Sequence, residues 1–339
     1  MRPLHGVRIL DLTRLLPGAY ATLLLADLGA DVIKIEDPRG GDGMRTLPPL
    51  SGGRNLYFER LNRHKRSVTL DLRSPDAAAV LDALASRSDV LVESFRPSTA
   101  TRLRVDAASL RRRHPRLICA SISGFGRGGP NAERAAHDIN YQSFAGLLRP
   151  PALPGPLIGD VGAAMQTAIA ILAALLDRQR TGSGSVVEVP IQDAAHAWSM
   201  FPTTADLASA CYTLYETADG QWLALGALEP KFWRGFCELI GRADLVPLQH
   251  AGGDEGARAL REVQAVMRTR PRDEWLARFA DADVCLSPVY TPAQASGVSR
   301  PAPPAGSPAP ALGADTDEVL DEAGIGAAER ARLRASRVI

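Results

Sequence analysis

The chain has 339 residues, of which 45% are hydrophobic and 23% charged, and its formal net charge is +1. This near-neutral balance argues against nucleic acid or a membrane surface as the main partner, because both attract a strong basic excess. The length exceeds what one hydrophobic core usually supports, so we expect two domains.

The four cysteines, Cys119, Cys211, Cys237 and Cys285, are scattered, which predicts neither a zinc site nor a disulfide framework. The N-terminal residues lack a signal-peptide pattern, and we expect no apolar stretch of membrane-spanning length. The sequence therefore predicts a cytoplasmic protein with no membrane partner.

The first 200 residues alternate between predicted strands and helices. Predicted strands cover 7–12, 31–36, 67–72, 89–93, 117–122 and 186–190. Predicted helices cover 19–28, 75–87, 107–113, 162–180 and 191–200, and a turn is expected at Pro17-Gly18. This order is typical of a parallel sheet covered by helices. We therefore predict an α/β fold with a large, Rossmann-like, open-sheet domain over residues 1–200.

The pattern changes beyond residue 200. Alternating strands at 212–217 and 221–226 are joined by Ala218-Asp219-Gly220, which predicts a hairpin. Helices are predicted at 230–241, 255–269 and 272–281. Together they predict a smaller α+β domain over residues 210–290. Residues 300–339 are predicted to form a linker, Pro/Ala/Gly/Ser-rich from 299 to 313, and a helix at 315–323 that returns to the large domain.

One stretch carries two groups that can transfer protons. His137 precedes an apolar helical segment, and Asp160 lies 23 residues later near the start of the next predicted helix. Side chains at such junctions can face one cleft, which makes both candidates for catalysis. Each also has a plainer interpretation: a surface histidine that caps a helix, and an N-cap aspartate.

Other features are equally open. Glu229 lies between a predicted strand and a predicted helix. Two interpretations are open: a residue of a functional site, or a first-turn carboxylate that only interacts with the helix dipole. The basic run 63–66 is a solvated face or a phosphate contact. Residues 124–129 lack a Gly-x-Gly-x-x-Gly pattern that leads into a helix, so we reject an NAD site. The remaining histidines have no carboxylate partners at ligand spacing, so no metal site is predicted.

Segments spread over nearly the whole chain resemble the class III coenzyme A transferase family (CaiB/BaiF), and within it the α-methylacyl-CoA racemase branch. They are residues 6–12, 26–36, 62–68, 95–97 and 124–126. Residues 136–141 are similar to the racemase His-Asp motif, and Ile158-Gly159-Asp160 is similar to the family's essential aspartate. Residues 226–232 are similar to the racemase segment whose glutamate, here Glu229, hydrogen-bonds the histidine.

The resemblance implies a racemase that inverts the α-carbon of 2-methyl-branched acyl-CoA thioesters by two-base proton transfer through an enolate. The alternative is a CoA transferase that forms an aspartyl-CoA thioester on Asp160, and a CoA-binding protein without activity is a third possibility. The implied catalytic residues are His137, Asp160 and Glu229. The implied CoA-contacting residues are Leu72, Arg73, Phe95, Arg96, Arg102, Asp138 and Tyr141.

The family also implies an interlocked homodimer in which the active site lies between the large domain of one subunit and the small domain of the other. No metal or redox cofactor is expected, and CoA enters as part of the substrate. Three features depart from the family pattern: Pro156 where racemases often carry Asn, residues 161–164 in place of a glycine-richer run, and Asp37-Pro38 where some members place an arginine. They bear on acyl specificity more than on the chemistry.

Overall fold

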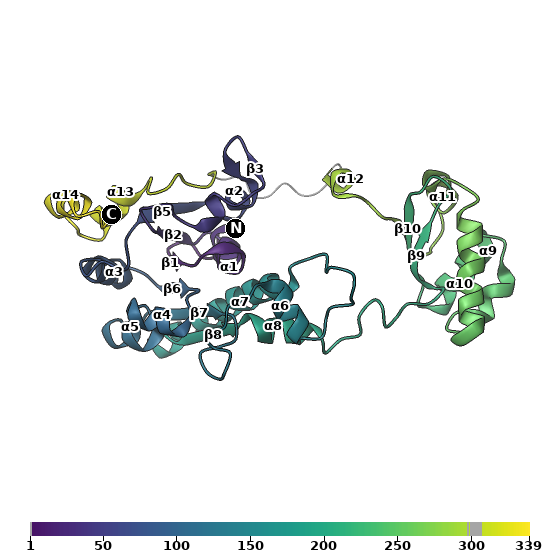
Figure 1. Cartoon of the computed structure of the whole chain (residues 1–339), viewed down its shortest axis with the longest axis horizontal. Coiled ribbons are helices and arrows are strands. Elements are labelled where there is room, and N and C mark those ends of the chain that lie inside the picture. The colour runs from purple at the N-terminus through teal and green to yellow at the C-terminus, as the bar shows by residue number, and fades with distance from the viewer. Residues whose placement is uncertain (1, 297, 299–306) are drawn as a thin grey trace. The chain divides into compact units, whose positions relative to one another are not determined.

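The structure, a computed structural model, describes residues 2–296, 298 and 307–339. These residues form two compact units, one of residues 2–200 with 307–339 and one of residues 201–296 with 298 (Figure 1). Of the linker expected at 299–313, residues 299–306 lie outside the described part of the chain.

The large unit is built on a six-stranded parallel sheet, which confirms the predicted α/β fold. Its order is β5-β2-β1-β6-β7-β8, and the strands are β1 (Arg8–Leu12), β2 (Asp31–Glu36), β5 (Lys65–Thr69), β6 (Val90–Glu93), β7 (Ile118–Ser123) and β8 (Val186–Pro190). The strand order reverses between β1 and β6. In open α/β sheets the carboxyl ends of the strands at such a point form the usual ligand crevice.

Alternate residues of the strands feed two hydrophobic cores, because successive side chains of a strand point to opposite faces of the sheet. Ile9 lies in one core and Leu10 in the other. The first core packs α1 (Leu15–Asp27), α6 (Asp138–Phe144), α7 (Ile158–Thr181) and α8 (Ile191–Trp198). The second packs α3 (Ala77–Ser86), α4 (Pro97–Arg102), α5 (Ala107–Arg113), α13 (Thr316–Glu322) and α14 (Ala327–Ala335).

Smaller elements complete the large unit: a 3-10 turn η1 (Gly43–Arg45), a short hairpin of β3 (Leu50–Ser51) and β4 (Arg54–Asn55), and α2 (Leu56–Leu61). The turn expected at Pro17-Gly18 is wrong, because α1 begins at Leu15 and buries both residues in its first turn. Proline is tolerated there, since the first N–H groups of a helix have no helical partner. A Cβ on Gly18 would lie 2.1 Å from Thr13 Cβ, so glycine alone fits.

Helix α7 overturns one expectation about apolar length. It has 24 residues, and an 18-residue window within it has a mean hydropathy of 1.6, so length and composition suffice for a membrane span. The expectation that no stretch reaches this length was wrong. Half of that window is buried inside the protein, and α7 packs against α1 and α8, as the core helix of a folded domain does.

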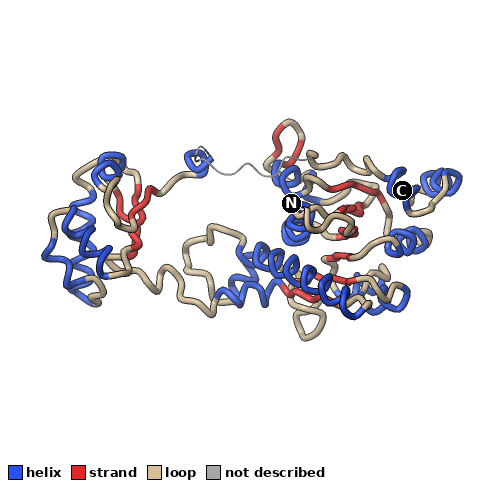
Figure 2. Tube along the Cα trace, turned by 180° about the vertical axis from the view of Figure 1, so that it is seen from behind, coloured by secondary structure: helices blue, strands red, loops and turns tan. Residues whose placement is uncertain are grey.

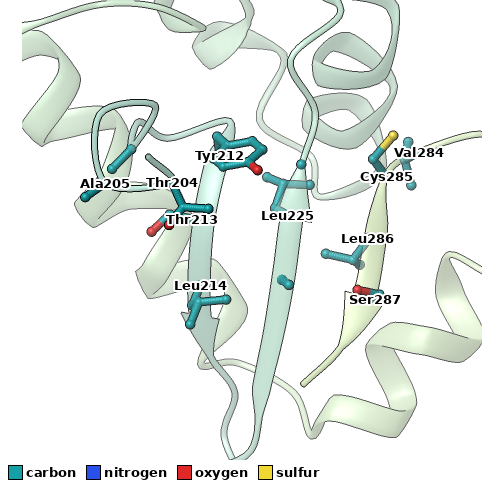
Figure 3. A pocket seen from close by; sticks show the side chains of 13 residues that line it. Thr204, Ala205, Tyr212, Thr213, Leu214, Leu225, Val284, Cys285, Leu286 and Ser287 are labelled. Carbon is teal, nitrogen blue, oxygen red and sulfur yellow. The ribbon is translucent and has the colours of Figure 1, made fainter. Parts of the chain in front are cut away.

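The small unit has a three-stranded antiparallel sheet in the order β11-β10-β9 (Figure 2). Its strands are β9 (Tyr212–Glu216), β10 (Trp222–Gly226) and β11 (Leu286–Pro288), and its helical elements are α9 (Pro230–Leu239), η2 (Ala243–Leu248), α10 (Gly253–Met267), α11 (Arg272–Arg278) and α12 (Pro292–Ser296). The predicted hairpin is β9 with β10. Stacked rings of Trp233, Phe236 and Phe279 anchor its core, with centroids 5.8 and 5.6 Å apart. A cavity of about 590 Å³ opens beside the sheet, next to Tyr212, Leu225 and Leu286 (Figure 3).

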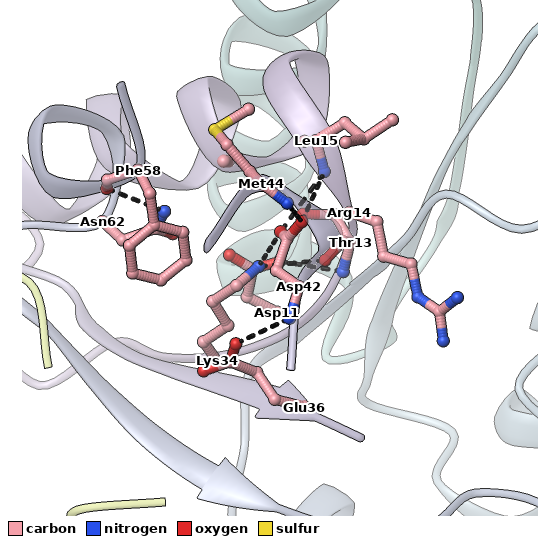
Figure 4. Close-up of polar contacts among 12 residues, drawn as sticks. Asp11, Thr13, Arg14, Leu15, Lys34, Glu36, Asp42, Met44, Phe58 and Asn62 are labelled. Carbon is pink, nitrogen blue, oxygen red and sulfur yellow. Dashed lines mark hydrogen bonds and ion pairs between the residues drawn. The ribbon is translucent and has the colours of Figure 1, made fainter. Parts of the chain in front are cut away.

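Charged side chains are buried between the strands and α1 of the large unit (Figure 4). Lys65 Nζ lies 3.0 Å from Asp11 Oδ2, and Lys34 Nζ lies 3.0 Å from Asp42 Oδ2. Lys65 also donates to Thr22 Oγ1 at 2.8 Å. Burial would raise the pKa of Asp11, but the two lysines outweigh it and hold that pKa well below its usual range.

The basic run 63–66 forms ion pairs within the large unit. Lys65 is 4% exposed, and burial lowers its pKa to about 8 although Asp11 opposes the shift. Arg63 pairs with Asp27, and Arg66 pairs at 2.6 to 2.7 Å with carboxylates of β2 and α13. The interpretation as a solvated face is wrong, because the run supplies ion pairs inside the fold, and a phosphate contact stays a prediction.

Replacing Lys65 by Met should lower the free energy of unfolding by about 3–5 kcal/mol, because the Asp11 carboxylate would lose its ion-pair partner in the protein interior. The matched control is Lys231→Met, which removes an exposed lysine that pairs with Asp283 at 3.6 Å. The control should change the free energy by less than about 0.5 kcal/mol. Urea unfolding measures both, and equal losses would contradict the structural role of Lys65.

Candidate active site

Two cavities, of about 240 and 420 Å³, lie at the carboxyl ends of the central strands. Arg14, which follows β1, and Phe95, which follows β6, line both of them. The Arg14 guanidinium carbon lies 5.6 Å from the centre of the Phe95 ring. The two cavities therefore adjoin at one cation-aromatic pair, at the place where the strand order reverses.

The smaller cavity holds four of the seven residues predicted to contact CoA: Leu72, Arg73, Phe95 and Arg102. Arg73 bonds Asp71 at 2.9 Å and Asp37 at 2.7 Å, and Arg39 bonds the same two carboxylates at 3.1 and 2.9 Å. These alternating charges hold the rim of the cavity in a defined shape. Arg102 makes a weaker contact, with Thr99 Oγ1 at 3.5 Å.

The larger cavity brings His137 and Asp160 together, as the sequence predicted for one cleft, and adds Arg96 and Tyr141 from the CoA-contact set. His137 occupies the N-cap position of α6, and its backbone N–H donates to Asn140 Oδ1 at 3.0 Å. Asp160 is the third residue of α7, whose N-cap is Leu157, so the N-cap interpretation of Asp160 is wrong. The catalytic roles of both residues stay predictions.

The electrostatics of the larger cavity centre on Asp160. Burial, and then the negative charge of Asp138, raise the pKa of Asp160 to about 7. Burial also raises the pKa of Tyr141 to about 12, so its hydroxyl stays protonated at neutral pH. A carboxyl group with a pKa near neutrality is available as both acid and base, which proton-transfer chemistry requires.

Asp138 does not lie in either cavity, unlike the other residues predicted to contact CoA. It is 2% exposed and is not among the described residues that line either cavity. Its Oδ1 accepts from the backbone N–H of Asp160 at 2.9 Å, and its Oδ2 accepts from Gln142 Nε2 at 2.5 Å. The side chain therefore faces the protein interior, and this position does not support direct contact with CoA.

Glu229 belongs to the small unit, where it is the exposed N-cap residue of α9. Gln249 Nε2 donates to the carbonyls of Ala227 and Leu228, at 3.0 and 2.8 Å, and so holds the loop that leads to Glu229. The pairing of Glu229 with His137 stays a prediction. Among residues 2–296, 298 and 307–339, no group of three or more His, Cys, Asp or Glu side chains could hold a metal ion.

The sequence reasoning missed Arg14 and Arg134, which both line the larger cavity. Arg134 lies over the Phe144 ring at 5.1 Å. Arg14 could have been found, since it stands directly after the first predicted strand, where a parallel sheet presents its ligand-binding loops. Arg134 carries no comparable signal, because it lies in a long loop between β7 and α6.

Comparisons with known proteins identify the family of this chain. The model of CoA-transferase family III matches residues 4–301, so the chain belongs to that family. It is 31% identical to human alpha-methylacyl-CoA racemase, over 99% of this chain and 97% of the relative. It is 33% identical to a probable fatty acyl-CoA transferase of Mycobacterium tuberculosis, Rv3272, over 81% of this chain and 79% of that protein.

Solved structures give the same result. A crystal structure of Rv3272 superposes with a TM-score of 0.80 at 30% identity and covers 93% of this chain and 98% of its own. A CaiB/BaiF family protein from Brucella suis gives 0.77 at 27% identity, with 95% and 99% coverage. The family is thus shown, while racemases and transferases are both among the relatives.

Asp160→Asn should stabilise the protein at pH 8 by roughly 1–2 kcal/mol, allowing for solvent screening of a half-buried group. Folding raises the pKa of Asp160, so the cost of its charge is absent below its unfolded-state pKa of about 4. That cost grows with rising pH and is complete above about 7. Urea unfolding should therefore show a smaller gain at pH 5.

The matched control is Asp193→Asn, which neutralises an exposed aspartate in the first turn of α8. Its effect should not depend on pH in this range. An Asp160→Asn effect that is the same at pH 5 and pH 8 would contradict the raised pKa of the Asp160 carboxyl.

Proposed function

We propose that this protein is an α-methylacyl-CoA racemase-like isomerase. The observation that carries the proposal is that His137 and Asp160, two groups able to transfer protons, line a single cavity. Inversion at a carbon needs a base on one face and an acid on the other. A family member that acted only as a transferase would need the carboxylate but not the histidine.

In this mechanism a thioester acidifies its α-proton, and one of the two groups removes it while the other returns a proton to the opposite face. His137 would serve one face and Asp160 the other, with acid and base roles exchanged between the two directions. The pKa of Asp160, near 7, supports this exchange, because both protonation states are populated at neutral pH.

The enolate formed on proton removal needs hydrogen-bond donors at its oxygen. The backbone N–H of Asp160 already donates to Asp138 at 2.9 Å, so it is engaged within the protein. Other N–H groups in the first turn of α7 are the better candidates, because the first N–H groups of a helix lack helical acceptors.

The smaller cavity would take the nucleotide part of CoA. Arg14, Arg73 and Arg102 place three guanidinium groups around it, and arginine binds phosphate oxygens in a bidentate manner. Because Arg14 and Phe95 line both cavities, a CoA thioester bound this way would extend past them toward His137 and Asp160.

The homodimer, the cytoplasmic location and the lack of a metal or redox cofactor also remain predictions.

A CoA transferase is the second candidate, favoured by the transferases among the relatives, such as succinyl-CoA–D-citramalate CoA-transferase of Chloroflexus aurantiacus at 35% identity. The Asp160 carboxylate would attack the thioester carbonyl and form a mixed anhydride as CoA thiolate departs. The thiolate would then give an aspartyl-CoA thioester and release the acid. An acceptor carboxylate would reverse these steps.

Incubation of the protein with a single enantiomer of a 2-methylacyl-CoA in deuterated water should replace the α-proton by deuterium and erode optical purity. Proton NMR and chiral analysis of the released acid measure the two effects. His137→Ala should reduce inversion at least 100-fold, because one of the two bases is lost. The control His5→Ala changes an exposed histidine outside both cavities and should leave the rate unchanged.

Normal inversion by His137→Ala would show that the histidine is not a base. Absence of exchange in the native protein, together with transfer of CoA to an added free acid, would instead favour the transferase.

Arg102→Ala should weaken the binding of free CoA about tenfold, because one charge-assisted contact to phosphate would be lost. Arg112→Ala is the matched control, an exposed arginine in the last turn of α5 that bonds Ser109. Isothermal titration calorimetry gives both affinities. Equal affinities in the two variants would remove Arg102 from the CoA site.

A further inference from the structure

The two helices that carry the proposed bases are joined by one buried carboxylate. Asp138 is the first residue of α6 and the direct neighbour of His137. Its Oδ1 accepts the backbone N–H of Asp160, in the first turn of α7, at 2.9 Å. A hydrogen bond from a helix N-terminal N–H to a carboxylate is among the stronger ones in proteins. It connects the chain beside one base to the backbone of the other.

The second oxygen of this carboxylate is also held. Gln142, 1% exposed, donates from Nε2 to Asp138 Oδ2 at 2.5 Å and to the carbonyl of Pro156 at 3.1 Å. A Cβ on Gly159 would lie 3.0 Å from Asp138 Oδ1, so any larger residue at position 159 would press on the carboxylate. Asp138 and Gln142 thus connect α6 to the start of α7 and to the loop before it.

We propose that Asp138 is a positioning residue: its buried carboxylate fixes Asp160 relative to His137 and acts on Asp160 by its negative charge. This inference rests on the proposed function, in that it gives Asp160 a reactive role in either chemistry. It replaces the predicted contact of Asp138 with CoA.

Within the described part of the chain, Asp138 accepts hydrogen bonds from one backbone amide and one side-chain amide, and neither donor is a cation. Both oxygens accept N–H groups, as an ionised carboxylate does. The negative charge of Asp138 therefore adds to the effect of burial in raising the pKa of Asp160. The charged and titratable side chains that line the cavity around Asp160 are Arg14, Arg96, Arg134, His137 and Tyr141.

The test is a direct titration of the Asp160 carboxyl by carbon NMR of protein labelled at aspartate Cγ, with Asp160→Asn used to assign the signal. In Asp138→Asn the amide oxygen can still accept the Asp160 N–H while the charge is removed. The midpoint of Asp160 should then fall by roughly one pH unit from its native value near 7. The control Asp193→Asn should leave it in place. An unchanged midpoint in Asp138→Asn would overturn the proposal.

A second measurement needs no Asp138 variant. The backbone N–H of Asp160 donates to the Asp138 carboxylate in the native protein, so this N–H should exchange with solvent deuterium much more slowly than an N–H without a hydrogen-bond acceptor. Exchange at the rate of an unprotected amide would also overturn the proposal.

Binding of free CoA separates this role from the contact predicted by resemblance. A positioning role leaves the CoA affinity of Asp138→Asn within about twofold of native and lowers kcat with little change in KM. A large loss of CoA affinity with no shift of the Asp160 midpoint would restore Asp138 as a CoA contact. Because the titrations need no turnover, they stand even if the protein proves to be neither racemase nor transferase.

Discussion

The site of this protein depends on the burial of paired charges beneath its first strand. Asp11 Oδ1 accepts from the backbone N–H of Thr13 at 2.9 Å, and Lys34 Nζ donates to the Thr13 carbonyl at 3.0 Å. Asp42 accepts from the N–H of Leu15, a residue with φ 61. Asp11, Lys34 and Asp42 therefore restrain the backbone on both sides of Arg14. Buried charge thus helps to determine where the guanidinium of Arg14, which lines both cavities, lies.

The general architecture could be predicted because it follows from local patterns. Apolar runs alternate with helical segments, and a parallel sheet is what such alternation buries on both faces. The placement of His137 and Asp160 at junctions likewise follows from local sequence. The burial of Lys65 could not be predicted, since its partner Asp11 is 54 residues away and a basic run alone looks solvated. The inward direction of Asp138 is set by a backbone amide 22 residues away.

Racemases and transferases of this family can share one scaffold because both need a reactive carboxyl in a partly desolvated place. Burial and a neighbouring negative charge weaken the acidity of Asp160, which suits a group that must hold a proton in one direction and accept it in the other. A nucleophile needs only the ionised form. In the proposed racemase mechanism His137 is the additional group, while the contacts around Asp160 would serve either chemistry.

Arg14 and Phe95 line both cavities, and this sharing limits how the enzyme can diversify. Where one part of a binding site holds CoA and a separate part selects the acyl group, the two parts can change independently. If CoA binds as proposed, a change that reshapes the acyl end near Arg14 also alters the surface offered to CoA. New specificities should then arise more readily from the loop around Arg134, which lines the larger cavity alone, than from the turn after β1.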